Sequence, residues 1–446
     1  MHHPLVTDDG AGVRKADPPA PVAAFGFTKR IRASPYYPAL THPVLRRLLP
    51  GVALSALGDG MSAVAIASLA LRLAPAGDRG LWVGAAVAAY SLPGAVGAVV
   101  LGRWMRGRGG AGLAFVNASA RAAALGLVGC LAIAGVLGLP AYVCLLGASS
   151  LLSAWGLAGR YTLVADALPA GHRVAGNTMF GVTDQVSLMV GPALAGVVTA
   201  LAGPAVVIAA DAATWALLAV SYARVAPMMA PPSPAPAPSP APAPSPTPPS
   251  AWSVIRRNRV LLGLLALSFV FYLLYGPVEV ALPVHVATGL HGSAALLGVF
   301  WAVFGAGAVA GELAAPFLRR LPVWPTMTAI VLGWGLALVP LGLDTPLWAA
   351  LAAFCAGAVI WGPWTSLSMA VFQDASPPGT LAAVLAARGS LLIVASPLGT
   401  ALGGPLVAAL GARGTLLGSA LATIALAVVT IAVLSWASRA RELIPS

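Results

Sequence analysis

Long apolar segments recur along the whole chain, and they constrain its fold more than any other feature. Crossing the hydrocarbon core of a membrane as an α-helix takes about 20 consecutive apolar residues, because every backbone polar group must then bond within the segment. Of the 446 residues, 59% are hydrophobic and only 9% are charged. A membrane β-barrel would need alternating polar and apolar residues, which these segments lack. The sequence therefore predicts an all-α membrane protein.

Reading the apolar segments between Pro, Gly and Arg residues predicts twelve transmembrane helices in two six-helix halves. The first six spans are 48–71, 81–101, 114–137, 141–164, 179–201 and 205–223. The second six are 260–282, 294–318, 326–343, 347–372, 381–410 and 415–436. The Pro/Ala/Ser-rich stretch 227–250 cannot bury a core and is predicted to be a cytoplasmic linker. The predicted parts are a tail 1–44, a half 45–226, the linker, a half 251–438 and a tail 439–446.

The basic residues between the spans predict the orientation of the chain. Lys and Arg concentrate in cytoplasmic loops, and with both termini inside, the opposite face keeps only Arg72, Arg79 and Arg413. The net charge of +12 comes from short clusters rather than one stripe, so it indicates topology and not a nucleic-acid surface. The excess of Arg over Lys, with abundant Ala, Gly and Pro, favours a bacterial source. We predict a multi-pass protein of the bacterial inner (plasma) membrane with both termini cytoplasmic.

The two halves show a faint internal repeat. Gly58-Asp59-Gly60 in the first helix aligns with Gly276-Pro277-Val278-Glu279 in the seventh, and Pro192 of the fifth aligns with Pro397 of the eleventh. Because each half has six spans, the repeat is parallel. Halves related in this way are typical of alternating-access transporters, whose substrate site lies between them near the bilayer midplane.

Four short segments form a recognisable pattern. They are Gly58-Asp59-Gly60, the Arg-rich turn 102–108, Arg160 with Leu168-Pro169 and Asn177, and Gly191-Pro192-Ala193-Leu194-Ala195-Gly196. Over about 45–438 this pattern resembles the major facilitator superfamily, and within it the drug, macrolide and siderophore efflux branch. The resemblance implies the major facilitator fold and a small-molecule substrate. We expect a monomer that needs no cofactor.

The Arg-rich turn departs from the pattern of the resembled family. There an Asp stands just before the first Arg of the loop between helices two and three, and here Gly102 takes that place. Arg103, Arg106 and Arg108, with Arg160, form the expected cytoplasmic loop motif. Without the Asp, the first three are expected to act mainly as topology signals.

The Gly-Pro pair of the fifth helix resembles the antiporter signature of the family. Proline bends a helix by leaving a carbonyl without its partner, and glycine lets a neighbouring helix pack closely. We therefore predict that Gly191, Pro192 and Gly196, with Pro397, form a rocking interface. The alternative is that these residues have no special role, since Gly and Pro are common in membrane helices.

Ionisable residues inside spans are costly in lipid, so each is a functional candidate. Asp59 and Glu279 lie on helices that line the central cavity in the resembled family, and we predict that they form a proton-coupling pair. A carboxyl in a partly dehydrated cavity can load a proton on one side and release it on the other. The alternatives are a structural pair with Arg121 for Asp59 and a solvated outer mouth for Glu279.

The remaining ionisable residues of the spans are expected to be structural. Arg121 is expected to pair with Asp184 or Asp59. Asp211 in the sixth helix and Glu312 in the eighth are also assigned to structural pairing, and Arg319 is a candidate partner of Glu312.

Aromatic residues on the seventh and tenth helices are candidates for the substrate cavity. Tyr272 and Tyr275 are three residues apart, as are Trp361 and Trp364, so each pair is expected to share nearly one helix face. Such rings stack on flat or cationic molecules. The alternative is packing against lipid or at the interface, where Trp and Tyr gather.

These features favour proton-coupled efflux of a small amphipathic molecule, such as a drug or natural product, across a lipid bilayer. A nutrient or metabolite uptake carrier shares the fold and is the main alternative. A polytopic membrane enzyme is disfavoured, because the sequence has no HExxH, Asp-rich or phosphate-binding motif. Cys130, Cys144 and Cys355 have no metal-ligand spacing, so no metal site is predicted.

Overall fold

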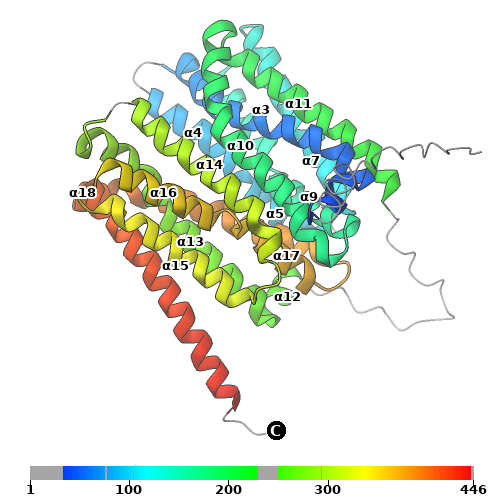
Figure 1. Ribbon diagram of the computed structural model, residues 1–446. Helices are drawn as coiled ribbons and strands as arrows, with labels where there is room; N and C mark the ends of the chain where they lie inside the picture. Colours follow the sequence, from blue (N-terminus) through cyan, green and yellow to red (C-terminus); the bar gives the residue numbers. More distant parts are fainter. Residues whose placement is uncertain (1–33, 76–77, 106, 230–249, 293, 443–446) are drawn as a thin grey trace, which may run out of the picture.

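The computed structural model describes residues 34–75, 78–105, 107–229, 250–292 and 294–442, and within these ranges its regular elements are helices (Figure 1). In the first half they are α2 (Tyr37–Thr41), α3 (Pro43–Leu73), α4 (Arg79–Ser91), α5 (Pro93–Val100), α6 (Gly102–Met105), α7 (Gly110–Ile133), α8 (Leu139–Ser150), α9 (Ser153–Ala167), α10 (Ala170–Ala202), α11 (Pro204–Val225) and η1 (Ala226–Met228). In the second half they are α12 (Ala251–Arg257), α13 (Arg259–Val284), η2 (His285–Gly289), α14 (Ala294–Leu318), α15 (Val323–Gly342), α16 (Leu347–Trp361), α17 (Trp364–Ala375) and α18 (Leu381–Glu442).

The helices confirm the predicted twelve-span fold. Within the described residues, 11 helical segments are long and apolar enough to cross a membrane. The last of them, Leu381–Trp436, is 56 residues long, far more than one crossing needs. Gly411 interrupts it with φ 71°, in the left-handed region that glycine tolerates. This segment therefore contains two spans, on either side of Gly411.

Three spans are broken near their middle. The second span is divided into α4 and α5 at Leu92, and Pro93 is the first residue of α5. The fourth is divided into α8 and α9 at Leu151–Leu152, and the tenth into α16 and α17 at Gly362–Pro363. Proline lacks the N–H that would continue the backbone ladder, so Pro93 and Pro363 account for two of these breaks.

The outer surface of the bundle is apolar. Large side chains such as Leu201, Trp348 and Trp436 are 73% exposed or more, whereas a soluble monomer rarely exposes extended apolar patches. The last part of α18, red in Figure 1, carries several of these side chains. This surface suits the hydrocarbon core of a bilayer, and the protein is a multi-pass membrane protein.

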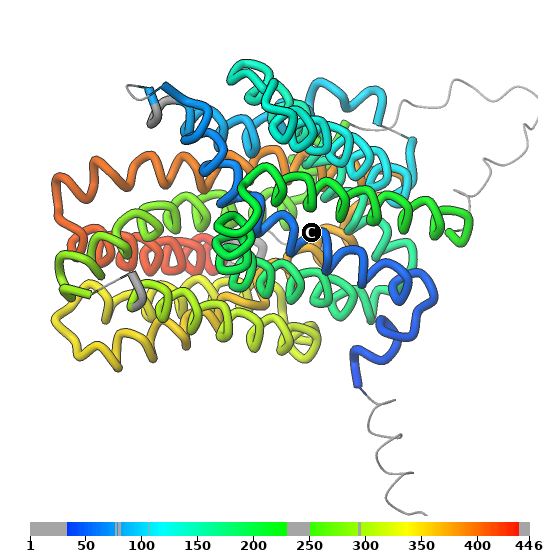
Figure 2. The backbone as a smooth tube through the Cα atoms, turned by 90° about the horizontal axis from the view of Figure 1, so that it is seen from above, coloured from blue at the N-terminus to red at the C-terminus, as the bar shows by residue number. Residues whose placement is uncertain are grey.

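The two ends of the bundle differ. At one end of the bundle α3 begins and α11 finishes, and the segment between the halves starts there. We call it the linker end; it lies toward α12 and α17 in Figure 1. The opposite end is the far end. Figure 2 shows the two halves packed side by side along the bundle.

Polar contacts close the linker end between the halves. Arg173 Nη1 lies 2.6 Å from Asp374 Oδ1, and Asn177 Nδ2 donates to Gln373 Oε1 at 3.0 Å. Gln373 Nε2 in turn donates to the Tyr161 carbonyl at 2.7 Å. All five residues lie on α9, α10 or α17 near the linker end, so the halves meet there through specific bonds.

Several helices begin earlier than their apolar segments suggest. The first span begins at Pro43, after the short helix α2, so part of the predicted tail is helical. α10 begins at Ala170 rather than near Met179, because its polar first turns pack against the other half. The linker predicted at 227–250 lies mostly outside the described residues.

Candidate functional site

Gly58-Asp59-Gly60 lies where α3 packs against two neighbouring helices. A Cβ atom at Gly58 would overlap Asp211 Oδ1 of α11, and one at Gly60 would lie 2.6 Å from the Ser187 carbonyl oxygen of α10. Larger residues would therefore push these helices apart. The two glycines let α3 pack tightly on two sides, and Asp59 between them reaches side chains of α4, α7 and α11.

Asp59 is the centre of a charged and aromatic cluster. Its Oδ1 atom accepts hydrogen bonds from Arg121 Nη2 at 2.7 Å, Tyr90 Oη at 2.8 Å and Trp215 Nε1 at 3.2 Å. The Arg121 guanidinium carbon lies 4.8 Å from the centre of the Tyr90 ring and 4.6 Å from that of Trp215. Such contacts stabilise a cation away from water. The Arg121 side chain is 9% exposed, whereas that of Asp59 is 36% exposed, so only the carboxylate is open to an approaching proton or ligand.

Asp211 is the second carboxyl group of this cluster. It is 1% exposed, and its Oδ2 accepts a hydrogen bond from the Ser62 hydroxyl at 2.6 Å. The Thr214 hydroxyl lies 3.3 Å from Oδ1. Asp211 interacts electrostatically with both Asp59 and Arg121. Asp59 is thus the carboxylate paired with the guanidinium, and Asp211 belongs to the cluster without an ion pair to Arg121.

Glu279 has a different environment in the second half. Its Oε2 accepts a hydrogen bond from the Thr400 hydroxyl of α18 at 3.0 Å, and it forms no ion pair with the described residues. Its helix also packs closely through glycine, since a Cβ at Gly399 would lie 3.1 Å from Gly276 Cα. The structure therefore places Asp59 and Glu279 in separate clusters, one in each half.

The prediction that Arg160 belongs to a cytoplasmic loop is wrong. Arg160 lies within α9 and forms two hydrogen bonds with Asp184 of α10, at 3.2 and 2.7 Å. Its guanidinium also lies over the Tyr161 and Phe180 rings. Of the two partners considered for Arg121, the structure therefore brings Asp59 to it and pairs Asp184 with Arg160. A bidentate pair satisfies a cation inside a span, which explains why Arg160 is not in a loop.

The Arg-rich turn lies at the surface. Arg103 and Arg108 are exposed, and Arg103 lies 5.2 Å from the centre of the Trp104 ring. Neither pairs with a carboxylate of the described residues. Arg106 lies outside the described residues.

Glu312 lies between the halves and does not pair with Arg319. It is 1% exposed and accepts a hydrogen bond from the Ser366 hydroxyl, while a Cβ at Gly181 of α10 would overlap its Oε1 atom. Arg319 follows the end of α14 and is exposed to solvent. The pairing considered for these two residues is therefore wrong, because Glu312 is buried beside Gly181 of α10, whereas the Arg319 guanidinium lies beside Gly171 nearer the start of that helix.

The tenth-helix tryptophans differ in burial. Trp361 is the last residue of α16 and Trp364 is the first of α17, and Gly362 and Pro363 between them keep helical backbone angles. Trp364 is fully buried with its ring centre 4.9 Å from that of Phe271, so a substrate cannot reach it in this state. Trp361 is only partly buried.

The seventh-helix tyrosines Tyr272 and Tyr275 are partly buried. The Tyr275 ring packs against Trp334 at 6.0 Å between ring centres. Their accessible parts keep them as candidates for the substrate cavity.

Only some of the predicted interface residues pack closely. A Cβ at Gly191 would lie 2.7 Å from Gly60 Cα, so this glycine sets the contact between α10 and α3. Gly196 has no neighbour within 4 Å of a Cβ built on it. Pro192 and Pro397 are exposed. The close contacts are thus within each half, and Gly196 takes no part in them.

Sequence reasoning missed Arg388. It is 3% exposed in α18, donates a hydrogen bond to the Ser368 hydroxyl at 3.1 Å and lies over the Phe372 ring at 5.3 Å. No carboxylate of the described residues pairs with it. It lies inside the predicted span 381–410, so the rule that selected Arg121 would have found it.

Together, two six-helix halves with buried charged groups define a polytopic membrane transporter. A family model described as Major Facilitator Superfamily matches residues 48–392, and the chain belongs to this superfamily. It is accordingly a secondary transporter for small molecules and not an enzyme. No group of three or more His, Cys, Asp or Glu side chains in the described residues could hold a metal ion.

Solved structures of transporters share this fold. A bacterial homologue of the iron transporter ferroportin, in an outward-facing state, is 16% identical with a TM-score of 0.67, covering 89% of this chain and 99% of its own. The human organic anion transporter MFSD10 (TETRAN) is 12% identical with a TM-score of 0.63, covering 87% and 99%. The proton:xylose symporter XylE is 12% identical with a TM-score of 0.60, covering 86% and 94%. No curated protein matches the chain.

Proposed function

We propose that this secondary transporter exports a small amphipathic molecule in exchange for protons. It acts as a monomer in the bacterial inner membrane, with both termini cytoplasmic. The observation that carries the proposal is the Asp59 cluster, because a partly exposed carboxylate inside a span is costly unless it has a function. Asp59 is the group that binds the proton.

The cluster can release Asp59 without losing Arg121. When a proton binds Asp59, the carboxyl becomes neutral and its attraction for Arg121 weakens. Arg121 keeps its contacts with the Tyr90 and Trp215 rings and its electrostatic interaction with Asp211. The guanidinium therefore stays in place when Asp59 is neutral. Because Arg121 is not left without partners, protonating Asp59 costs less free energy.

The second half supplies apolar contacts for the substrate. Tyr272, Tyr275 and Trp361 present partly accessible rings, on which a flat or cationic molecule can stack. Glu279, held by the hydroxyl groups of Thr400 and Ser396, can accept a second proton or contact a cation on the substrate. We assign these four residues to the half of the cavity that recognises the substrate.

Alternating access requires the closed linker end to open. Opening separates Arg173 from Asp374 and Asn177 from Gln373, and it uncovers Glu312. Half-exposed ion pairs and neutral hydrogen bonds each contribute little net stability. The contacts that close this end can therefore break and re-form during transport.

The test of coupling compares two transport modes in inside-out membrane vesicles, with a substrate chosen beforehand by counterflow in proteoliposomes. Asp59→Asn keeps the shape of the side chain but cannot titrate. Uptake into inside-out vesicles driven by a pH gradient should fall at least about tenfold, while substrate exchange should survive because rocking without a net proton is enough for exchange. The matched control is Asp344→Asn, which removes an exposed aspartate paired with Arg413 far from the cluster.

Two results would contradict the assignment. If Asp59→Asn retains full gradient-driven uptake, Asp59 is not the coupling group. If both modes are lost together, Asp59 is the structural partner of Arg121. If gradient-driven uptake occurs in right-side-out vesicles and not in inside-out vesicles, the protein is a nutrient carrier rather than an exporter.

The proposed orientation has its own test. A reporter fused after Arg441, or inserted within 231–250, should behave as cytoplasmic, because the basic residues concentrate on that side. A periplasmic signal at either place would reverse the orientation and the direction of transport inferred from it.

A further inference from the structure

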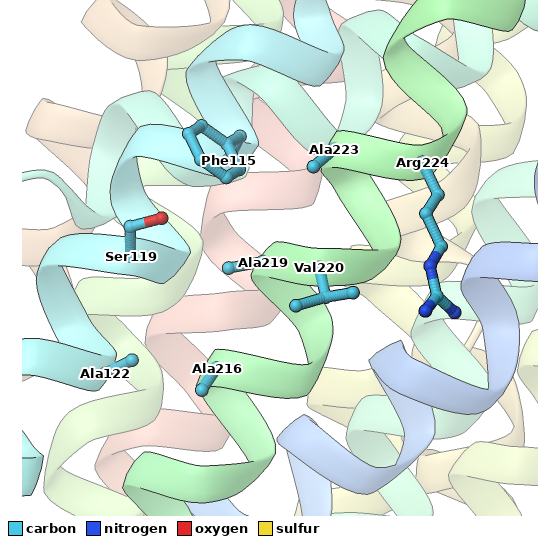
Figure 3. A pocket seen from close by; sticks show the side chains of 8 residues that line it. All are labelled: Phe115, Ser119, Ala122, Ala216, Ala219, Val220, Ala223 and Arg224. Carbon is cyan, nitrogen blue, oxygen red and sulfur yellow. The ribbon is translucent and has the colours of Figure 1, made fainter.

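A furrow runs along the outer surface of the first half, between α7 and α11. Figure 3 shows the side chains that line it. They are Phe115, Ser119 and Ala122 from α7, and Ala216, Ala219, Val220, Ala223 and Arg224 from α11. Their spacing of three or four residues places each set on one helix face. Because most of these side chains are small, the two helices leave a hollow between them.

The furrow is apolar and opens outward. Phe115 is 39% exposed and Val220 is 44% exposed, although both lie in spans that face the bilayer. From Ala216 to Arg224 the furrow follows α11 for about 12 Å, at the rise of an α-helix. None of the residues assigned to proton coupling or substrate lines it. Its shape and chemistry suit a hydrocarbon chain.

A basic hollow adjoins the furrow at the linker end. Arg46 and Arg47 of α3, with Pro50, line it together with Ser221 and Arg224 of α11. Arg224 lines both hollows, and Figure 3 shows its side chain running from α11 toward the blue ribbon of α3. The three arginines are exposed, and none pairs with a carboxylate of the described residues. The hollow therefore offers three unneutralised guanidinium groups at the level where the span begins.

We propose that this composite site binds an anionic phospholipid. Arg46, Arg47 and Arg224 hold the phosphate of the headgroup, because guanidinium groups bind phosphate oxygens through paired hydrogen bonds. One acyl chain lies in the furrow between α7 and α11. Basic pockets between transmembrane helices bind anionic headgroups in this way. If the three arginines served only as a topology signal, an apolar furrow beside them would have no role; in a lipid site it holds the acyl chain.

The site joins three of the four helices that carry the Asp59 cluster. α3 carries Asp59, α7 carries Arg121 and α11 carries Trp215. A lipid seated between them holds these helices together from outside. Binding should therefore raise the thermal stability of the protein, as any ligand of the native state does. This inference does not depend on the proposed direction or coupling ion.

The test uses the full chain purified in detergent and titrated with dioleoylphosphatidylglycerol, followed by native mass spectrometry and by thermal unfolding. Dioleoylphosphatidylcholine and inorganic phosphate serve as the zwitterionic lipid and the free anion. Arg46→Gln/Arg224→Gln removes two phosphate ligands, and Ala223→Phe fills the furrow. The matched controls are Arg256→Gln/Arg257→Gln, exposed at the same end, and Ala213→Phe, exposed on α11 outside the furrow.

The wild type should bind phosphatidylglycerol more tightly than phosphatidylcholine. The arginine variant should weaken this binding about tenfold, and Ala223→Phe should weaken it about threefold by excluding the acyl chain. Both control variants should bind as the wild type does, and phosphate at millimolar concentration should not compete. Equal binding of the two lipids, an equal loss in the controls, or competition by phosphate alone would overturn the proposal.

Discussion

The two halves build the same helix contact and then use it differently. In the first half, Gly60 of α3 meets Gly191 of α10; in the second, Gly276 of α13 meets Gly399 of α18. In both halves, the first span carries the acidic residue and packs on the fifth span. Close packing at glycine is thus a shared feature of the repeat, which the sequence showed only faintly.

The surroundings of the acidic residues differ between the halves. Asp59 is held by an arginine that lies between two aromatic rings, whereas Glu279 has a threonine hydroxyl. The second half fills its interior with aromatic rings instead, with Phe304 in contact with both Trp334 and Phe354. The comparison indicates that ion pairs within the spans are concentrated in the first half and aromatic contacts in the second.

The largest effect is expected where the halves agree. Gly191→Leu and Gly399→Leu should each reduce transport to below about a tenth, because their side chains would collide with the backbone of the facing helix. Gly196→Leu is the matched control on α10, since a side chain there meets open space. Exchange in proteoliposomes, normalised to inserted protein, measures the effect. Normal transport by either variant would show that the contact is not needed.

An intermediate effect is expected where the halves differ. Arg121→Met should destabilise the protein by about 2 to 3 kcal/mol, because it removes the cation paired with Asp59; the partial exposure of Asp59 lowers the figure. Asp59→Asn/Arg121→Met should recover part of the loss. Arg388→Met should cost less than about 1 kcal/mol, because it leaves no carboxylate unpaired.

Unfolding of the three variants in one detergent gives the comparison. Equal losses for Arg121→Met and Arg388→Met would mean that the ion pair is not what distinguishes the halves.

The smallest effect is expected where the halves meet. Arg173 and Asp374 have side chains 21% and 49% exposed, so Asp374→Asn should cost less than about 1 kcal/mol. That corresponds to less than about a fivefold shift toward an open linker end. Spin labels at the exposed positions Arg108 and Arg320, one in each half, would report the opening as a longer distance. A shift of more than tenfold toward the open state would show that this ion pair is the main contact holding the linker end closed.

The fold could be predicted from the sequence because lipid imposes a simple rule on length and polarity. Twelve apolar segments were enough to find the spans, including the two joined within α18. The start of α10 could not be found in this way, because His172, Arg173 and Asn177 are polar. They are helical because they face the other half or solvent at the linker end, which hydropathy does not record.

The candidate site could be predicted only in part. Asp59 and Arg121 stood out as charges inside spans, and the structure joins them. Arg160 was misplaced because its position near a span end resembled a loop, although Asp184 lies close enough to satisfy it. The burial of Trp364 against Phe271 could not be predicted, because the spacing of the two tryptophans does not record which neighbours cover them. Three-dimensional partners decided each of these cases.

The broken fourth and tenth spans bear on how the linker end opens. Where α8 meets α9, and where α16 meets α17, the regular backbone ladder is already interrupted. Bending at these two joints therefore sacrifices fewer backbone bonds than bending an unbroken helix. The short segments α9 and α17 contact each other through the Tyr161 carbonyl and Gln373. We expect the linker end to open mainly by bending at these two joints, which separates α9 from α17 while the far end keeps its packing.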